Sequence, residues 1–157
     1  MVFAVQILMP GVTRHLGLIP ADLIERLRVW QPFTYMFLHG GLGHIFFNML
    51  ALFFFGPRLE ARLGSPRFLG LYLTSGIMGA LLSFTNPMIG VIGASGAVYG
   101  VMFGFAHYWP REVVHIWGVL PVEVRWLVVG MTVLSLVSGF GGAGDGAGGA
   151  GALGFFN

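Results

Sequence analysis

Ser95 is the residue best suited to nucleophilic chemistry in this sequence. It stands in Gly93-Ala94-Ser95-Gly96, within residues 68–110, which contain no Asp, Glu, Lys or Arg. The flanking glycines leave the hydroxyl uncrowded on a backbone that can turn sharply or pack closely. At membrane depth such a hydroxyl can attack a carbonyl, or it can bond back to its own helix at a contact between small residues. These four residues leave both interpretations open.

His44 and Asn48 form a second polar pair within an apolar stretch. They are four residues apart, so on a helix their side chains project from the same face. Histidine and asparagine are costly in a bilayer and usually line a cavity or a site. Both can donate hydrogen bonds to an oxyanion that forms at a nearby carbonyl. The alternative is a hydrogen bond between helices, worth about 1 kcal/mol.

Glycines recur every four residues after Ser95, at positions 96, 100 and 104. This period makes a flat helix stripe against which a second helix can lie at short range. We expect the stripe to face the segment at the end of the chain, so that a partner helix brings a side chain up to Ser95. Tyr99, one turn beyond Ser95, is placed to stack on the group that approaches the serine.

The composition is that of an integral membrane protein. Hydrophobic residues make up 56% and charged residues 9%, with a mean hydropathy of +0.83, whereas roughly a quarter of the residues in soluble domains are charged. The absence of cysteine excludes disulfides, thiolate metal sites and a cysteine nucleophile. The basic residues are arginines scattered singly, and the net charge of +2 indicates no nucleic-acid partner.

The uncharged stretches predict a single transmembrane domain over residues 1–157. A membrane helix needs about 20 mostly apolar residues. We expect helices over residues 43–56, 68–84, 95–109 and 124–138, with a turn at Thr85-Asn86-Pro87. Residues 1–9 are apolar and predict a partial first helix, not a signal peptide. The Gly/Ala-rich residues 139–157 predict a partial last helix, with a flexible linker as the alternative.

Arginine placement predicts the orientation of a multi-pass protein in a bacterial-type inner or plasma membrane. Five arginines are expected in loops on one face and three on the other, which favours a cytoplasmic amino terminus. Residues 13–42 then face outward as short amphipathic pieces. The two groups are Arg58, Arg62, Arg67, Arg111 and Arg125, and Arg14, Arg26 and Arg28.

Three motifs, in order along the chain, resemble those of the rhomboid family of intramembrane serine proteases. The segment 44–48, HIFFN, resembles the family's H-x-x-x-N on its second helix. The segment 60–65, EARLGS, is similar to the E-x-R-x-G-S turn that follows that helix. The segment 93–99, GASGAVY, resembles the G-x-S-G-x-x-Y that opens the fourth helix. The resemblance covers residues 18–137.

The resemblance implies a six-helix bundle, here with truncated first and last helices, and a Ser–His dyad in a cavity below the outer surface. Ser95 is then the nucleophile that attacks a peptide carbonyl in a transmembrane segment of a membrane-protein substrate. His44 and Asn48 stabilise the oxyanion together with the Ser95 backbone N–H, and Tyr99 packs against the catalytic imidazole. No metal or organic cofactor is implied. The mechanism is a nucleophile and a base without the third group of a triad.

The catalytic base that the family pattern implies is missing from this sequence. In the family it is a histidine within a sequence like G-D-x-V-A-H-x-x-H-L-G-G on the sixth helix. Residues 144–147, GDGA, and Leu153-Gly154 resemble the flanks of this motif, and the base position falls at Ala152. A second departure is Gln31, where the family often has arginine in the first loop.

The histidines that are present do not replace the missing base. His107 lies twelve residues along the helix that Ser95 opens, about 18 Å away at 1.5 Å per residue. His115 is expected in the following loop, on the opposite face of the membrane. His15 and His39 are expected in the outward-facing loop and match no base motif. Without a base, Ser95 is predicted to be inactive in the chain as written.

Three functions remain open at this stage. One is an intramembrane serine endopeptidase with Ser95 as its nucleophile, whose base histidine is missing from this sequence. A second is a catalytically inactive rhomboid-like protein that binds membrane helices or serves as a subunit of a larger membrane complex. A transporter or channel is disfavoured, because no intramembrane carboxylate precedes Asp145 and no internal repeat is visible.

Overall fold

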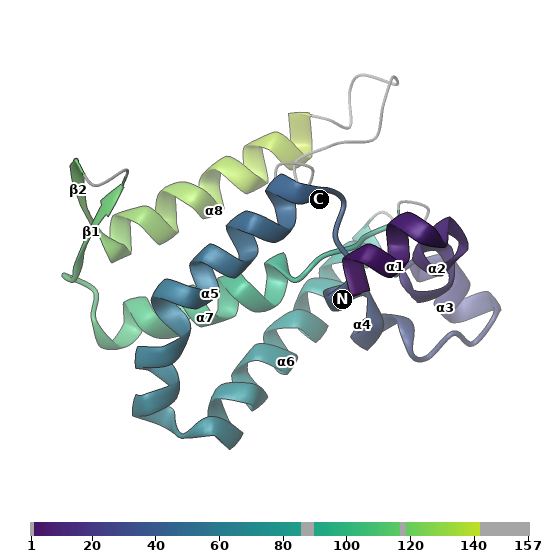
Figure 1. The fold of residues 1–157 in the computed structure, drawn as a ribbon, viewed down its shortest axis with the longest axis horizontal. Helices are drawn as coiled ribbons and strands as arrows, with labels where there is room; N and C mark the ends of the chain where they lie inside the picture. The colour runs from purple at the N-terminus through teal and green to yellow at the C-terminus, as the bar shows by residue number, and fades with distance from the viewer. Residues whose placement is uncertain (1, 86–89, 117–118, 142–157) are drawn as a thin grey trace.

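The computed structural model describes residues 2–85, 90–116 and 119–141 (Figure 1). Within these residues the fold is almost entirely helical, which confirms the predicted fold class. Two helices are long and apolar enough to cross a membrane, Leu42–Leu63 and Ser65–Thr85. Short helices gather at one side of the molecule, two short strands lie at the opposite side, and the longer helices α5, α6, α7 and α8 lie between them (Figure 1).

Short helices occupy the first residues of the chain and most of the predicted outward-facing segment, residues 13–42. Several of them have a proline in the first turn, where its missing N–H costs no intrahelical bond and its fixed φ suits the helix. The predicted first helix over residues 1–9 corresponds to the first of them. The elements are α1 (Val2–Leu8), α2 (Pro10–Leu16), α3 (Pro20–Glu25), α4 (Gln31–Thr34) and the 3₁₀ helix η1 (Tyr35–Phe37).

Helix α5 (Leu42–Leu63) continues beyond the predicted end at residue 56 and passes through Pro57. A proline inside a helix costs about 3 kcal/mol, but the residues that follow it are held by tertiary contacts. Leu59 is fully buried, and the Arg58 guanidinium lies 4.5 Å from the centre of the Trp109 ring. These contacts offset the proline, so Arg58 and Arg62 lie in a helix and not in the predicted loop.

Helices α6 (Ser65–Leu82) and α7 (Ser95–Tyr108) approach each other at glycines. A Cβ added to Gly96 would lie 3.4 Å from the Cα of Gly79, and one added to Gly100 would overlap the Ser75 side chain. The prediction that the glycine stripe faces the end of the chain is therefore wrong, because α6 already occupies that face. The 3₁₀ helix η2 (Ser83–Thr85) ends α6 before the break to α7.

Replacing Gly100 with leucine is expected to lower the free energy of unfolding by about 1–3 kcal/mol, because the new side chain must displace Ser75 and separate α6 from α7. Gly70→Leu is the matched control, since Gly70 lies in α6 with open space beside it. Thermal unfolding in detergent micelles measures the melting temperatures of both variants. Equal melting temperatures for the two variants would contradict the close α6–α7 contact.

A β-hairpin follows α7 where the sequence predicted only a loop. Strands β1 (Val113–Ile116) and β2 (Leu120–Glu123) pair antiparallel, and their branched residues suit a strand. Helix α8 (Val124–Gly141) starts directly after β2, so Arg125 lies in a helix and not in a loop. An ion pair of 2.9 Å between Arg58 and Glu112 ties this end of α7 to α5.

Two apolar clusters hold the helices together. The first joins α5, α7 and the beginning of α8 around Phe55, Leu59, Phe105 and Val128. The second joins the short helices to α6 and α7 and includes Leu18 and other buried residues. The candidate site lies on α5 and α7, and on α7 it adjoins the first cluster, which includes Ala94 and Val98 beside Ser95.

Candidate active site

Ser95 is the first residue of α7, and the loop before it is held by two backbone attachments. Val91 exchanges two backbone hydrogen bonds with Leu18, of 2.8 and 3.0 Å, and the Gly93 N–H donates to the Tyr35 carbonyl at 2.9 Å. Gly93 has φ +122°, a conformation that residues with a side chain rarely adopt. The glycine two residues before the serine is therefore required by the backbone of the turn.

Tyr35 anchors this loop to α6. Its hydroxyl donates to the Gly76 carbonyl at 2.5 Å. Burial, together with the nearby Tyr72, raises the pKa of Tyr35 to about 12. The hydroxyl therefore stays protonated and remains a donor throughout the physiological pH range, so the contact that supports the Gly93 turn does not titrate.

The position of Ser95 argues against the interpretation that its hydroxyl bonds back to its own helix. Thr74 and Thr132 do so, donating to carbonyls four residues earlier at 2.7 and 2.8 Å. Ser95 has no preceding turn of α7 whose carbonyl it could reach in this way. Its side chain is nevertheless largely buried, with the residue 9% exposed. Ser95 is therefore a buried residue at a helix start, and its role as a nucleophile stays a prediction.

His44 and Asn48 lie on the buried face of α5, with 4% and 2% of their surfaces exposed. The Gly40 N–H donates to His44 Nδ1 at 3.2 Å, so the neutral ring carries its proton on Nε2. Within the described part of the chain, neither His44 Nε2 nor Asn48 Nδ2 has a hydrogen-bond partner. Two buried donors on one helix face are thus left unused, which is unusual for polar groups in a protein interior.

The packing of α5 against α7 sets the relative height of these residues. The Phe55 and Phe105 rings lie 5.1 Å apart, and both helices begin on the side nearer the short helices (Figure 1). Counting back from this pair along each helix by about ten residues, or about 15 Å, reaches His44 on α5 and Ser95 on α7. His44 and Ser95 therefore each lie in the first turn of their helix, about ten residues before this ring contact.

The fourth candidate, Tyr99, points toward α8. Its hydroxyl donates to the Met131 carbonyl at 3.1 Å, and its ring centre lies 6.4 Å from that of Phe103. The predicted base position, Ala152, lies outside the described residues, as does most of the predicted last helix over residues 139–157. Packing of Tyr99 against a catalytic imidazole stays a prediction.

Two residues near His44 were not identified from the sequence as part of the site. His39, expected on the outward-facing loop, is buried, and its ring centre lies 5.1 Å from that of His44. Burial lowers the pKa of His39, which favours a neutral ring beside His44. Gln6 of α1 bonds to the backbone of His39. The available signal was that Gln6 is the one polar residue in the apolar stretch 1–9.

Gln31 anchors the segment before α5 despite its departure from the family pattern. The residue is fully buried, and its Oε1 accepts a hydrogen bond of 3.2 Å from the Ile19 N–H. The Thr34 hydroxyl donates to the Leu16 carbonyl at 2.6 Å nearby. These two neutral side chains attach the segment to the short helices, together with the ion pair of 2.8 Å between Arg28 and Asp22.

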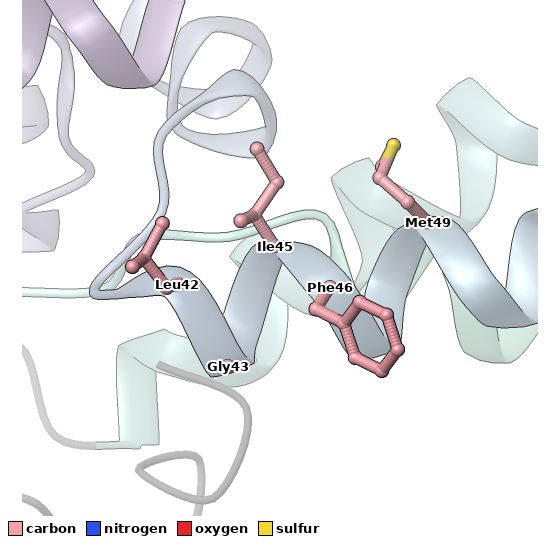
Figure 2. Close-up of a pocket in the computed structure, with 5 residues that line it drawn as sticks. All are labelled: Leu42, Gly43, Ile45, Phe46 and Met49. Carbon is pink, nitrogen blue, oxygen red and sulfur yellow. The ribbon is translucent and has the colours of Figure 1, made fainter.

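The opposite face of α5 at this level is apolar. A shallow groove there is lined by Leu42, Gly43, Ile45, Phe46 and Met49, and Figure 2 shows the larger of these side chains projecting from the first turns of α5. None of them carries a group that could take part in acid–base chemistry. This face suits contact with lipid or with an apolar helix.

Comparison with known proteins identifies relatives of the chain. A family model described as "Rhomboid domain" matches residues 26–154. RHOMBOID-like protein 1 of Arabidopsis thaliana is 42% identical over 81 residues, which cover 51% of this chain and 21% of that protein. The putative rhomboid protease YdcA of Bacillus subtilis (strain 168) is 44% identical over 77 residues, covering 48% and 38%.

A longer match joins the chain to the rhomboid protease GlpG of Salmonella choleraesuis (strain SC-B67). The two are 30% identical over 120 residues, which cover 71% of this chain and 42% of that protein. The chain thus spans less than half the length of each of these relatives. The family match nevertheless covers most of the chain and includes the helices that carry Ser95, His44 and Asn48. The chain therefore belongs to the rhomboid family of integral membrane proteins, a family of intramembrane serine proteases.

Proposed function

We propose that this chain carries the nucleophile and the oxyanion site of an intramembrane serine endopeptidase, and that position 152 is where the base belongs. Ser95 is the nucleophile, and His44 and Asn48 are the oxyanion donors. The observation that supports this most is the pair of buried, unused donors, His44 Nε2 and Asn48 Nδ2, on the helix that packs against the one opened by Ser95.

The chemistry needs one proton acceptor that the described residues do not provide near Ser95. The Ser95 Oγ attacks the scissile carbonyl, and its proton passes to a base, which later returns the proton to the leaving amine. The negative charge moves to the carbonyl oxygen, where donors such as His44 Nε2–H and Asn48 Nδ2–H stabilise it. With alanine at position 152, Ser95 keeps its proton, so this chain has the oxyanion half of the mechanism without the base.

The proposed substrates are membrane proteins with a transmembrane segment that can unwind near Ser95. The apolar face of α5 shown in Figure 2 suits the approach of such a segment or of lipid. We further propose a multi-pass protein in a bacterial-type inner or plasma membrane with a cytoplasmic amino terminus, on the basis of the arginine distribution.

A second candidate function is a catalytically inactive rhomboid-like protein that binds membrane helices, alone or within a larger membrane complex. The observation that favours it is the absence of histidine from residues 116–157, which include the position expected for the base. The two candidates share the Ser95 site and differ in whether Ser95 ever becomes nucleophilic.

Fluorophosphonate labelling of the 157-residue chain in detergent micelles tests the missing base. We expect no labelling, because the loss of one member of a nucleophile–base unit costs nearly as much as the loss of both. The control is Ser95→Ala, which reports any labelling at other residues. Labelling that disappears in Ser95→Ala would contradict the proposal and would mean that another group of this chain acts as the base.

A further inference from the structure

The side chain of Gln6 holds both backbone polar groups of His39. Gln6 Oε1 accepts the His39 N–H at 2.9 Å, and Gln6 Nε2 donates to the His39 carbonyl at 3.2 Å. A third bond of 3.2 Å runs from Nε2 to the Thr13 hydroxyl. Gln6 is only 8% exposed, although its neighbours Val5 and Ile7 are exposed. A long polar side chain in this apolar helix is thus used entirely for these contacts.

Gly40, the residue after His39, makes the contact that sets which ring nitrogen of His44 carries the proton. The Gly40 N–H donates to His44 Nδ1 at 3.2 Å, and it can do so only while Nδ1 is unprotonated. In the other neutral tautomer, two N–H groups would face each other and Nε2 would become an acceptor. An acceptor cannot stabilise an oxyanion, so the position of the Gly40 peptide decides whether His44 can act as a donor.

Resting on the proposed function, we propose that Gln6 is a positioning residue for the oxyanion site. By holding the peptide groups of His39, it keeps the Gly40 N–H on His44 Nδ1, which keeps the proton of His44 on Nε2. The His39 ring contributes packing, since it is buried against the His44 ring at 5.1 Å. Gln6 lies outside residues 26–154, the part of the chain matched to the rhomboid domain. The short amino-terminal helix is thereby part of the site and not only an anchor.

The tautomer of His44 is the readout that separates positioning from a structural role. Nitrogen-15 NMR of histidine-labelled protein in detergent micelles distinguishes protonated from unprotonated ring nitrogens, and His44→Gln assigns the resonances. We expect Nε2–H in the unaltered chain and a mixture of the two tautomers in Gln6→Leu. The matched control is Thr13→Val, which removes the third bond of Gln6 but leaves the His39 bonds, and should keep Nε2–H.

A second variant covers the case in which Gln6→Leu does not fold, as judged by thermal unfolding. Gln6→Glu, measured at a pH at which the new carboxyl group is ionised, keeps the length of the side chain and an acceptor for the His39 N–H but lacks the donor to the His39 carbonyl, and should also give a mixture. A folded Gln6→Leu or Gln6→Glu that retains His44 wholly as Nε2–H would overturn the proposal. So would an equal loss of Nε2–H in Thr13→Val.

The outcome does not depend on catalysis. The NMR readout is made on the chain with alanine at position 152, so a shifted tautomer supports the positioning role even if Ser95 never reacts. In a variant that labels at Ser95, Gln6→Leu should lower the labelling rate constant on the order of tenfold. This is a smaller decrease than the one expected when the His44 donor is removed altogether. An unchanged rate with a shifted tautomer would overturn the oxyanion role of His44, not the positioning by Gln6.

Discussion

Ala152→His is expected to convert Ser95 from an inert hydroxyl into one that reacts with fluorophosphonate reagents and cleaves transmembrane substrates. Replacing this alanine supplies the proton acceptor at the position where the family motif has its base. Removing the base from a serine nucleophile costs on the order of 10⁴–10⁶ in rate, so restoring it should produce a change from no labelling to measurable labelling. Labelling and substrate cleavage in detergent micelles or liposomes measure the effect.

Two controls show whether the gain comes from this position. Ala150→His introduces the same residue two positions earlier, where the motif does not place the base, and should not label. Ala152→His combined with Ser95→Ala should lose all the labelling gained. If Ala152→His stays unreactive while its thermal unfolding is unchanged, the inactive-scaffold function is favoured over the protease.

His44→Ala in the Ala152→His background is expected to slow labelling and cleavage by about 10²–10³. This is the usual cost of removing one donor from an oxyanion hole. The physical reason is that His44 Nε2–H is buried and without a partner in the described part of the chain, so no other bond has to break when an oxyanion forms. The rate constant for labelling and kcat for cleavage should fall together, while KM changes little.

His107→Ala is the matched control for this variant. His107 is exposed and lies near the end of the helix that Ser95 opens, about 18 Å from the serine. It should leave the rate unchanged. A His44→Ala variant that labels as fast as its parent would remove His44 from the oxyanion site and leave Asn48 and the Ser95 N–H as the donors.

Much of the fold was accessible from the sequence because membrane helices are encoded by long uncharged stretches. The expected helices at residues 68–84 and 95–109 overlap α6 and α7 closely, since the charged residues that bound the uncharged stretch are local signals. Most of the predicted turn at Thr85-Asn86-Pro87 lies outside the described residues. The end of α5 was missed because the uncharged stretch from which it was predicted stops before Arg58. Only the burial of Leu59 and the contacts of Arg58 show why the helix continues.

The glycine stripe could also be predicted from the sequence, but the helix that packs against it could not. The four-residue period of Gly96, Gly100 and Gly104 predicts close packing, but it contains no information on which helix fills the stripe. Gly79 and Ser75 of α6 occupy it. The antiparallel strands β1 and β2 after α7 were also missed, because each has only four residues and such a short run is a weak signal in the sequence.

The sequence by itself determined the class of protein, the family and the candidate residues Ser95, His44 and Asn48, because composition and motif spacing are written in the order of the residues. Only the tertiary structure could show that Gln6 and His39 belong to the neighbourhood of His44. Gln6 lies 33 residues before His39 and is joined to it by hydrogen bonds that no local pattern encodes. The Gly40 N–H determines which ring nitrogen of His44 carries the proton, and the position of this N–H depends on that long-range contact. Such groups meet only after the chain has folded, because the free energy that brings them together comes from burial of the surrounding apolar surface.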